Sequence, residues 1–513
     1  MVNLNIEEAK IFHQATKHSY RSVRQSAHYL DWDNRPLLYK IYRDLPPIRL
    51  PCDFPAPAAG TLQAVSSPGC NEGKGLNLKE LSQVLFYSGG LTKKKSLSGG
   101  EEYYFRAAAC AGALYPIEIY VVCKDIPGLE AGVYHFNPQD FGLRRLRSGD
   151  YRPELVSTAG DNQGIAGAAA TLIFSAIFWR SAWKYRARSY RHCFWDSGTI
   201  LANLMAVAAS EQIPWSVEMA FVDSRVNQIL GLDGNKEASL CLVPLGRSLD
   251  WAGHVRRQEL LPLSYEVEPL SREEVNYPVL KQMHAASCLV ADEEARPWRG
   301  PCVRPQGETR YQTVPLELSL SQSRPLGEVI LARGSTRRFA QEAISFAQLS
   351  TILDRSTCGI PADFLAGPET SLLDLYLIIN AVDGLDPGAY YFSPSQKRLE
   401  RLKAGSFRQE AGYLCLEQTL ATDASAVVFF LSDLVRVLNR FGNRGYRAAQ
   451  LEAGITGGKL YLSSYSLGLG ATGLTFYDDD VVRFFSPHAE GKDAIFVVAL
   501  GRAAKAKDRD RVC

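Results

Sequence analysis

The two halves of this 513-residue chain repeat one another, and this repeat constrains the fold more than any other feature of the sequence. Residues 384–392 (GLDPGAYYF) restate residues 128–136 (GLEAGVYHF) at an offset of 256 positions. At the same offset, residues 444–447 (RGYR) restate residues 188–191 (RSYR). Two fused copies of one domain can pack as the subunits of a homodimer do, through the same surface of each copy. The repeat therefore predicts two domains of about 240 residues that form a pseudo-dimer within one chain.

The repeat also predicts the domain boundaries and the fold class. We expect the first copy at residues 1–255, a linker at 256–271 and the second copy at 272–513. The apolar periodicity predicts helices and strands in matching order in the two copies: helices at 78–85 and 346–353, strands at 117–123 and 372–381, strands at 169–174 and 426–431, long helices at 191–210 and 447–466, and last strands at 240–245 and 495–500. These elements are mixed without regular βαβ alternation, so the expected fold class is α+β. Small residues in the long helices, such as Ala202, Gly454 and Gly458, indicate close packing against another backbone.

Composition excludes several classes of function. The net charge is +2 and no Lys/Arg block forms a phosphate-tracking stripe, so nothing favours nucleic acid as a partner. The 11 cysteines include no CxxC pair, which argues against a zinc site and a disulfide framework, and His18, His135 and His192 are expected to be hydrogen-bonded loop or core histidines. The first residues lack the apolar segment of a signal peptide, and the longest apolar runs are too short to span a membrane. We therefore expect a cytoplasmic protein in a reducing compartment.

A basic motif, Arg333-Gly-Ser335-Thr-Arg337, stands just before the first long predicted helix of the second copy. Two guanidinium groups on either side of a hydroxyl can bind a phosphate and a neighbouring polyol. The alternative is a basic helix cap on the surface. The corresponding region of the first copy, residues 67–74, contains no arginine.

The first copy instead contains a run of small residues, 106–116 (RAAACAGALYP). Because Gly112 lacks a side chain, this loop can bring its backbone close to a flat ligand, and Pro116 fixes the entry into the next strand. The alternative is a tight loop against the other copy. The second copy has the bulkier and acidic sequence ADFLAGPE at 362–369.

Together these motifs resemble the SagB/ThcOx-type dehydrogenases, FMN enzymes within the nitroreductase superfamily. The string 106–120 resembles their Ala-Gly-Ala-Leu-Tyr-Pro motif, and Arg333-x-Ser335-x-Arg337 resembles the superfamily's motif for the FMN phosphate and ribityl chain. The opening His13-x-x-Thr16-Lys-His-Ser is also similar. The resemblance implies an α+β fold, a dimer-like arrangement and a flavin at the interface.

Carried onto this chain, the resemblance implies one composite site and one that has lost its function. The second copy retains the arginine motif and a Gly-rich turn after its long helix, and the first copy retains the Ala-Gly loop. The expected cofactor-binding residues are Arg333, Ser335, Arg337, Ala109, Cys110, Ala111, Gly112, Gly470, Ala471, Thr472, Gly473 and Arg502. Arg502 has a counterpart in Arg247, so a purely structural role is its alternative. Cys110 departs from the family's serine, and a thiol is a poorer donor than a hydroxyl.

The resemblance also indicates a catalytic pair, Lys184-Tyr185, similar to the Lys-Tyr pair of azoline-oxidising members. A lysine can remove a proton if burial or nearby cations lower its pKa. The second copy has Arg440-Phe441 there, which can neither accept a proton nor offer a hydroxyl. The alternative is a surface lysine beside a core tyrosine.

The expected activity is two-electron transfer through the N5 atom of FMN, with oxidation of a C–N bond (azoline to azole) in a small molecule or modified peptide. One alternative is an NAD(P)H-dependent nitro- or quinone-reductase, and another is a flavin-binding partner protein without turnover. Because the chain supplies both halves of the interface, we expect a monomeric pseudo-dimer or a further homodimer of it.

Overall fold

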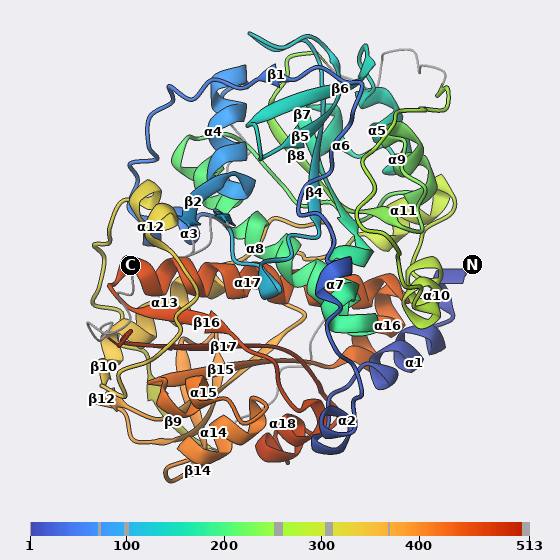
Figure 1. The fold of residues 1–513 in the computed structure, drawn as a ribbon. Coiled ribbons are helices and arrows are strands. Elements are labelled where there is room, and N and C mark those ends of the chain that lie inside the picture. The colour runs from blue at the N-terminus through green and yellow to red at the C-terminus, as the bar shows by residue number, and fades with distance from the viewer. Residues whose placement is uncertain are drawn as a thin grey trace.

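The structure, a computed structural model, describes residues 2–69, 73–96, 102–250, 260–302, 311–367 and 370–504. It contains two domains of mixed helix and sheet, one from each copy of the repeat, and two long central helices lie between their sheets (Figure 1). These helices are α8 (Ser189–Ser210) and α17 (Arg444–Ser466). The expected α+β class and tandem arrangement are confirmed.

The first copy is built on a six-stranded sheet with the strand order β1-β6-β5-β4-β7-β8. Every neighbouring pair is antiparallel, and β4, β5 and β7 are buried along their whole length. The strands are β1 (Ile48–Arg49), β4 (Ile117–Cys123), β5 (Gly132–Asn137), β6 (Gly142–Ser148), β7 (Ala168–Ile177) and β8 (Glu237–Arg247). A separate hairpin consists of β2 (Leu91–Ser96) and β3 (Glu102–Arg106).

The second copy repeats this sheet and adds one strand, in the order β16-β17-β15-β11-β13-β14-β9. Its strands are β9 (Gln312–Pro315), β11 (Asp374–Ile379), β13 (Gly388–Ser393), β14 (Arg398–Ala404), β15 (Ala426–Ser432), β16 (Gly470–Gly473) and β17 (Asp493–Gly501). A small parallel pair consists of β10 (Ile344–Ser345) and β12 (Val382–Asp383).

Several of the remaining helices pack on the central helices α8 and α17. In the first copy the remaining helices are η1 (Val2–Leu4), α1 (Glu7–Ala15), α2 (Tyr20–Arg24), η2 (Trp32–Asn34), α3 (Thr61–Val65), α4 (Leu78–Gly89), η3 (Ala111–Ala113), α5 (Arg152–Thr158), α6 (Gln163–Ala166), α7 (Phe178–Tyr185), η4 (Arg186–Arg188) and α9 (Asp223–Leu230). In the second copy they are α10 (Pro278–Ala286), α11 (Asp292–Trp298), α12 (Leu326–Ala332), α13 (Phe346–Thr357), α14 (Arg408–Leu414), α15 (Thr419–Asp423), α16 (Leu434–Phe441) and α18 (Asp478–Phe485).

Helices α4 and α13, which correspond in the two copies, both begin with a capping box. Asn77 accepts from the backbone N–H of Glu80 at the start of α4, and the Glu80 side chain accepts in return from Asn77. Ser345 and Gln348 form the equivalent capping box at the start of α13. Such boxes satisfy the free N–H groups of a first turn, so both predicted helices begin where the sequence places them.

Central helices α8 and α17 cross at unusually short range. A β-carbon placed on Gly198 would lie 2.4 Å from the backbone nitrogen of Ile455, and one on Gly454 would lie 2.5 Å from the carbonyl oxygen of Trp195. A β-carbon on Gly458 would meet Ala202 at 2.6 Å. The predicted close packing of the long helices is therefore confirmed.

Segments of each copy pack on the other copy. The N-terminal helices α1 and α2 lie beside α16 and α18 of the second copy, and α12 lies beside α3 of the first (Figure 1). The backbone of Asn443 donates to the carbonyl of Asn3, and the backbone of Gly327 donates to the carbonyl of Pro57. The copies are thus intertwined. The domain boundaries expected at residues 255 and 272 remain a prediction from the sequence. Part of the predicted linker, residues 256–259, lies outside the described residues.

Buried ion pairs cross the interface in two symmetrical sets. Arg188 and Arg191 of the first copy both bind Asp478 of the second, at 2.9 and 2.7 Å. Conversely, Arg444 and Arg447 of the second copy both bind Asp223 of the first, at 2.6 and 2.7 Å. The repeated Arg-x-Tyr-Arg motifs therefore hold the two copies together.

Candidate active site

The arginine motif of the second copy lies against the Ala-Gly loop of the first. Arg333 follows α12, is only 8% exposed, and donates from Nε to the carbonyl oxygen of Ala107 at 2.9 Å and from Nη2 to that of Arg106 at 3.3 Å. Lys93, from the β2–β3 hairpin, donates to the carbonyl oxygen of Arg333 at 2.6 Å. The two halves that the sequence assigns to one site are in direct contact.

The Gly-rich segment positions the centre of this motif. The prediction of a turn is wrong for Gly470–Gly473, which form the edge strand β16. The backbone N–H of Thr336 donates to the carbonyl oxygen of Ala471 at 3.0 Å. A β-carbon at Gly470 would lie only 2.1 Å from Thr336 Oγ1, so glycine is required there. Pairing with β17 outweighs the low strand preference of glycine.

Ser335 lies near the edge strand β16, and Thr472 is part of this strand. Ser335 Oγ lies 3.5 Å from Tyr461 Oη, and this tyrosine hydroxyl accepts from the backbone N–H of Gly473 at 2.5 Å. The Gly473 N–H is therefore engaged within the protein, whereas the Ser335 hydroxyl is partly exposed and makes only this long contact. Thr472 is buried.

A carboxylate on α8 fixes the Ala-Gly loop. Asp196 Oδ1 accepts from the backbone N–H of Ala111 at 2.8 Å, and Asp196 Oδ2 accepts from the Cys110 thiol at 3.2 Å. Thr199 donates to the carbonyl oxygen of Ala109 at 2.6 Å. Gly112 has a φ of +65°, a conformation that favours glycine. The backbone of the loop therefore has one fixed shape and presents no side chain at Gly112.

The electrostatics of the loop keep its thiol protonated. Burial and the nearby Asp196 carboxylate raise the pKa of Cys110 well above its usual range. Burial raises the pKa of Asp196 to about 7. Because only a thiolate is a good nucleophile, the geometry favours Cys110 as a loop residue rather than a reactive centre.

Lys184 and Tyr185 lie at the end of α7, directly over the Ala-Gly loop. The position that a β-carbon would take at Gly112 is 2.8 Å from Tyr185 Oη and 3.4 Å from Lys184 Nζ. Burial and the positive charge of Arg337 lower the pKa of Lys184, and burial raises the pKa of Tyr185. Among the described residues, Arg337 has no ion-pair or hydrogen-bond partner and is exposed. Lys184 and Tyr185 of the first copy thus lie against Gly112, and the charge of Arg337 of the second copy acts on Lys184.

The backbone of Arg502 pairs with a residue just after the arginine motif, whereas its side chain binds a backbone carbonyl group. The backbone N–H of Ala340 donates to the carbonyl oxygen of Arg502 at 2.9 Å, whereas Arg502 Nε donates to the carbonyl oxygen of Ala343 at 3.1 Å. Its guanidinium is thus held by the protein, which favours the structural alternative for this residue.

The pseudo-symmetric position, where a second site would lie, is closed by backbone pairing. The backbone N–H of Val217 donates to the carbonyl oxygen of Pro361 at 2.8 Å, and that of Asp363 donates to Val217 at 3.0 Å. Met219 and Ala220 donate their backbone N–H groups to Asp363 Oδ2. At this position, residues 217–220 of the first copy are thus paired with residues 361–363 of the second copy.

Two buried carboxyl groups lie at this closed position. Glu218 accepts from Asn162 at 2.6 Å and from Ser216 at 2.7 Å. Burial and the neighbouring Asp363 raise the pKa of Glu218, and burial raises the pKa of Asp363. An anionic ligand is disfavoured here, because two buried carboxyl groups lie where these segments meet.

Sequence reasoning missed Asp196, Lys93 and the role of His192. Asp196 and its repeat counterpart Glu452 are both acidic, and Glu452 accepts from the backbone of Leu372, so the shared carboxylate was a usable signal. The expectation that His192 is hydrogen-bonded is wrong: neither ring nitrogen has a partner among the described residues. His135 does bind Glu118, at 2.7 Å.

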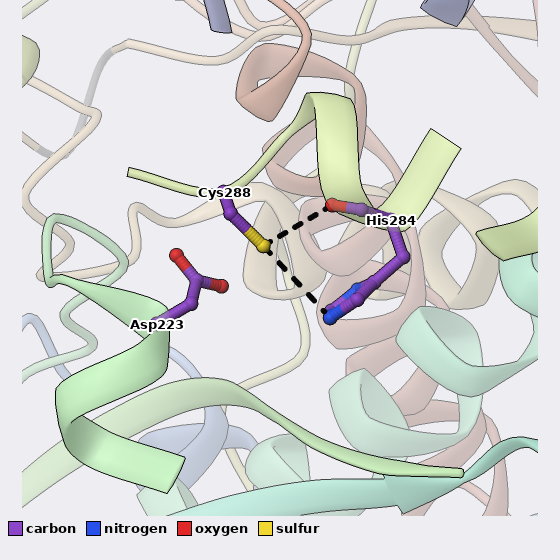
Figure 2. A group of neighbouring side chains, drawn as sticks. All are labelled: Asp223, His284 and Cys288. Carbon is purple, nitrogen blue, oxygen red and sulfur yellow. Dashed lines mark hydrogen bonds between the residues drawn. The ribbon is translucent and has the colours of Figure 1, made fainter. Parts of the chain in front are cut away.

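A cluster of potential metal ligands lies outside this site, where Asp223 from α9 approaches His284 and Cys288 at the end of α10 (Figure 2). It borders a cavity of about 270 Å³. However, both oxygens of Asp223 accept from buried guanidinium groups, those of Arg444 and Arg447. Arg447 Nη2 also lies 3.4 Å from Cys288 Sγ. Two cations among the would-be ligands disfavour a metal ion, so the cluster belongs to the interface.

No helix in the described part of the chain is long and apolar enough to cross a membrane.

The comparisons with known proteins concern the family and the fold of the chain. The Nitroreductase family model matches residues 85–247 and 330–502, one match in each copy. The chain is 32% identical over 175 residues to "Putative nitroreductase MJ1384" of Methanocaldococcus jannaschii. This match covers 34% of this chain and 83% of that protein. It is 30% identical over 179 residues to the trifolitoxin-processing protein TfxB of Rhizobium leguminosarum bv. trifolii, covering 32% of this chain.

The chain spans 46% of the length of TfxB, about half of that relative. A solved structure described as a nitroreductase from Anabaena variabilis superposes with a TM-score of 0.78 at 26% identity, over 97% of this chain and 99% of that one. The likeness extends over both copies.

Proposed function

Since this chain belongs to the nitroreductase family, we propose that it is an FMN-dependent oxidoreductase with one flavin site built from both copies. The observation that carries the proposal is that the Ala-Gly loop of the first copy contacts both the arginine motif of the second copy, through Arg333, and the pair Lys184-Tyr185. Family membership supports flavin chemistry in general, and the choice of FMN rests on the arginine motif.

The residues present fit this cofactor. Arg337 offers a guanidinium without an ion-pair partner among the described residues, and Ser335 offers a hydroxyl with only one long contact. Arg333 fixes the motif against the Ala-Gly loop. The Ala-Gly loop carries small side chains and Gly112 is exposed, so a flat ring can approach the loop beside Lys184 and Tyr185. Guanidinium groups suit a phosphate, and the bare loop suits an isoalloxazine ring.

The proposed reaction is dehydrogenation of an azoline ring to an azole, in a modified peptide or small molecule, in which the new double bond forms between two adjacent ring carbons. FMN, when bound, supplies a two-electron acceptor. Lys184 Nζ takes the proton from the substrate carbon, because its lowered pKa increases the neutral fraction of the amine. Tyr185 keeps its proton, since burial raises its pKa, and orients the substrate by donating a hydrogen bond. Support for a peptide substrate comes from the similarity to TfxB, a trifolitoxin-processing protein.

A second candidate is reduction of nitro compounds or quinones with NAD(P)H. The similarity to MJ1384, which spans 83% of that relative, favours it. Reduction needs the flavin site but does not need a base at Lys184. A third candidate, a flavin-binding partner protein without turnover, is favoured by the closure of the pseudo-symmetric site at Val217 and Asp363.

The described cysteines are free thiols, which supports a reducing, cytoplasmic location. The chain supplies both sides of the interface, so we propose that a single chain is the functional unit. A further homodimer would leave this site unchanged.

Flavin stoichiometry tests the proposal first. Visible absorbance against protein concentration should give one FMN per chain after reconstitution. Arg337→Ala should weaken binding, and Arg333→Ala/Arg337→Ala should abolish it, whereas Arg338→Ala outside the motif serves as the matched control. Two FMN per chain would contradict the closed second site, and no flavin would contradict the proposed function.

A further inference from the structure

His192 is a buried imidazole without a hydrogen-bond partner in the part of the chain that the structure describes. It lies on α8, is 4% exposed, and neither ring nitrogen has a partner among the described residues. Buried polar groups are nearly always paired, so an unpaired one calls for a reason. The imidazole is kept here at the cost of its desolvation.

Two aromatic neighbours define where this imidazole acts. Its ring centroid lies 4.1 Å from that of Tyr185, in an edge-to-face arrangement at 65°. On its other side it stacks on Trp195 at 4.7 Å and 27°. The contact with Tyr185 is the shorter, so His192 packs directly on the phenol ring whose hydroxyl lies near Gly112.

The imidazole is neutral. Burial, together with the positive charges of Arg188, Arg191 and Lys184, lowers the pKa of His192 well below its usual value. A neutral imidazole has one N–H donor and one acceptor nitrogen. The edge-to-face arrangement at 65° is compatible with weak donation from the imidazole edge to the face of the phenol ring.

The second copy supplies a natural comparison. At the repeat offset His192 corresponds to Ala448, and Tyr185 corresponds to Phe441. The two neighbouring helix positions are unchanged, because Tyr190 and Arg191 correspond to Tyr446 and Arg447. The imidazole is therefore present only in the copy that has the tyrosine, and this distribution links the two residues.

We propose that His192 is a positioning residue for Tyr185, whose ring it holds by an edge-to-face contact so that the hydroxyl stays over Gly112 and beside Lys184. The inference deepens the proposed function and rests on it for the role of Tyr185 in substrate binding. The contact itself belongs to the protein and needs no cofactor.

The test separates this contact from the reaction. 3-Fluorotyrosine placed at position 185 reports the environment of the phenol by ¹⁹F NMR in the flavin-free protein. We expect one sharp resonance in the wild-type background. His192→Ala, which copies Ala448, should shift and broaden it. His192→Phe keeps a ring but lacks the N–H and should restore it only in part. Cys193→Ala, a buried change on the same helix, should leave it unchanged.

The flavin-loaded enzyme gives the second readout. His192→Ala should lower kcat on the order of tenfold or more, because a displaced catalytic group is costly, while the FMN dissociation constant stays unchanged. An identical ¹⁹F resonance in His192→Ala would overturn the inference even if the enzyme is active. An altered resonance in a protein that binds no flavin would overturn the proposed function and leave the contact standing. Full rescue by His192→Phe would show that packing alone suffices and would overturn the N–H role.

Discussion

Gly198 and Gly454 occupy the same position in the two copies and face each other where α8 crosses α17. Each lies against the backbone of the opposite helix, so neither tolerates a β-carbon without movement of that helix. The pseudo-two-fold relation between the copies therefore passes through this pair. Because α8 carries Asp196 and His192, and α17 leads into β16, the crossing also sets the distance between the two halves of the candidate site.

Gly198→Ala should destabilise the protein through this crossing. The added methyl would lie 2.4 Å from a backbone nitrogen, so the helices must separate, and we expect a loss of about 1–3 kcal/mol in the free energy of unfolding. Denaturant unfolding measures it. Gly75→Ala, whose β-carbon would meet only Arg247 at 3.5 Å, is the control. Equal stability of the two variants would contradict the tight crossing.

Asp223→Asn should be far more destabilising than a surface change of the same kind. It leaves Arg444 and Arg447 buried without their carboxylate, and breaking such a pair costs about 3–5 kcal/mol. The two guanidinium groups lower the pKa of Asp223. The stability that Asp223 contributes is therefore fully present above the pKa of an unfolded aspartate, about 3.9, and is lost as the pH falls through the pKa of Asp223 in the folded protein. Unfolding at pH 7 and at acid pH measures both effects.

Asp250→Asn is the matched control, because the Asp250–Lys124 pair is 76% exposed on the carboxylate side. Such exposed ion pairs contribute about 0–1 kcal/mol to stability.

A rise in the thermal midpoint of the wild-type protein on addition of Zn²⁺ would contradict the assignment of Asp223, His284 and Cys288 to the interface rather than to a metal.

Glu218→Gln should stabilise the protein at alkaline pH. The folded pKa of Glu218 is raised, so the native state keeps a proton that the unfolded chain releases above pH ~4.3, and stability falls as pH rises through the folded pKa. Glutamine can keep both contacts, accepting from Asn162 and donating to Ser216. The thermal midpoint should therefore exceed that of the wild type at pH 8 and match it near pH 4.

The exposed Glu410→Gln variant controls for the change in net charge. A gain that is equal at both pH values would show that the buried carboxyl group is not responsible.

Much of this architecture could be predicted from the repeat alone. The offset of 256 residues pairs the long helices, the capped helices α4 and α13, and the two halves of the candidate site. The exchange of segments between copies could not be predicted, because it depends on contacts such as Asn3 with Asn443, 440 residues apart. The strand at Gly470 was missed because glycine has a low preference for strands. The lack of a hydrogen-bond partner for His192 among the described residues was missed because it depends on how the side chains pack.

The proposed catalytic pair, Lys184 and Tyr185, can be tested by exchanging the sequences of the two copies. Lys184→Arg/Tyr185→Phe copies Arg440-Phe441 and should lower the rate of azoline oxidation by about 10²–10⁴, because a guanidinium cannot accept the proton. The reverse change, Arg440→Lys/Phe441→Tyr, is the matched control and should leave the rate unchanged. Both variants should retain NAD(P)H-dependent quinone reduction if they bind FMN. Loss of quinone reduction together with oxidation would assign the pair to cofactor binding, and an unchanged oxidation rate would contradict its role as base.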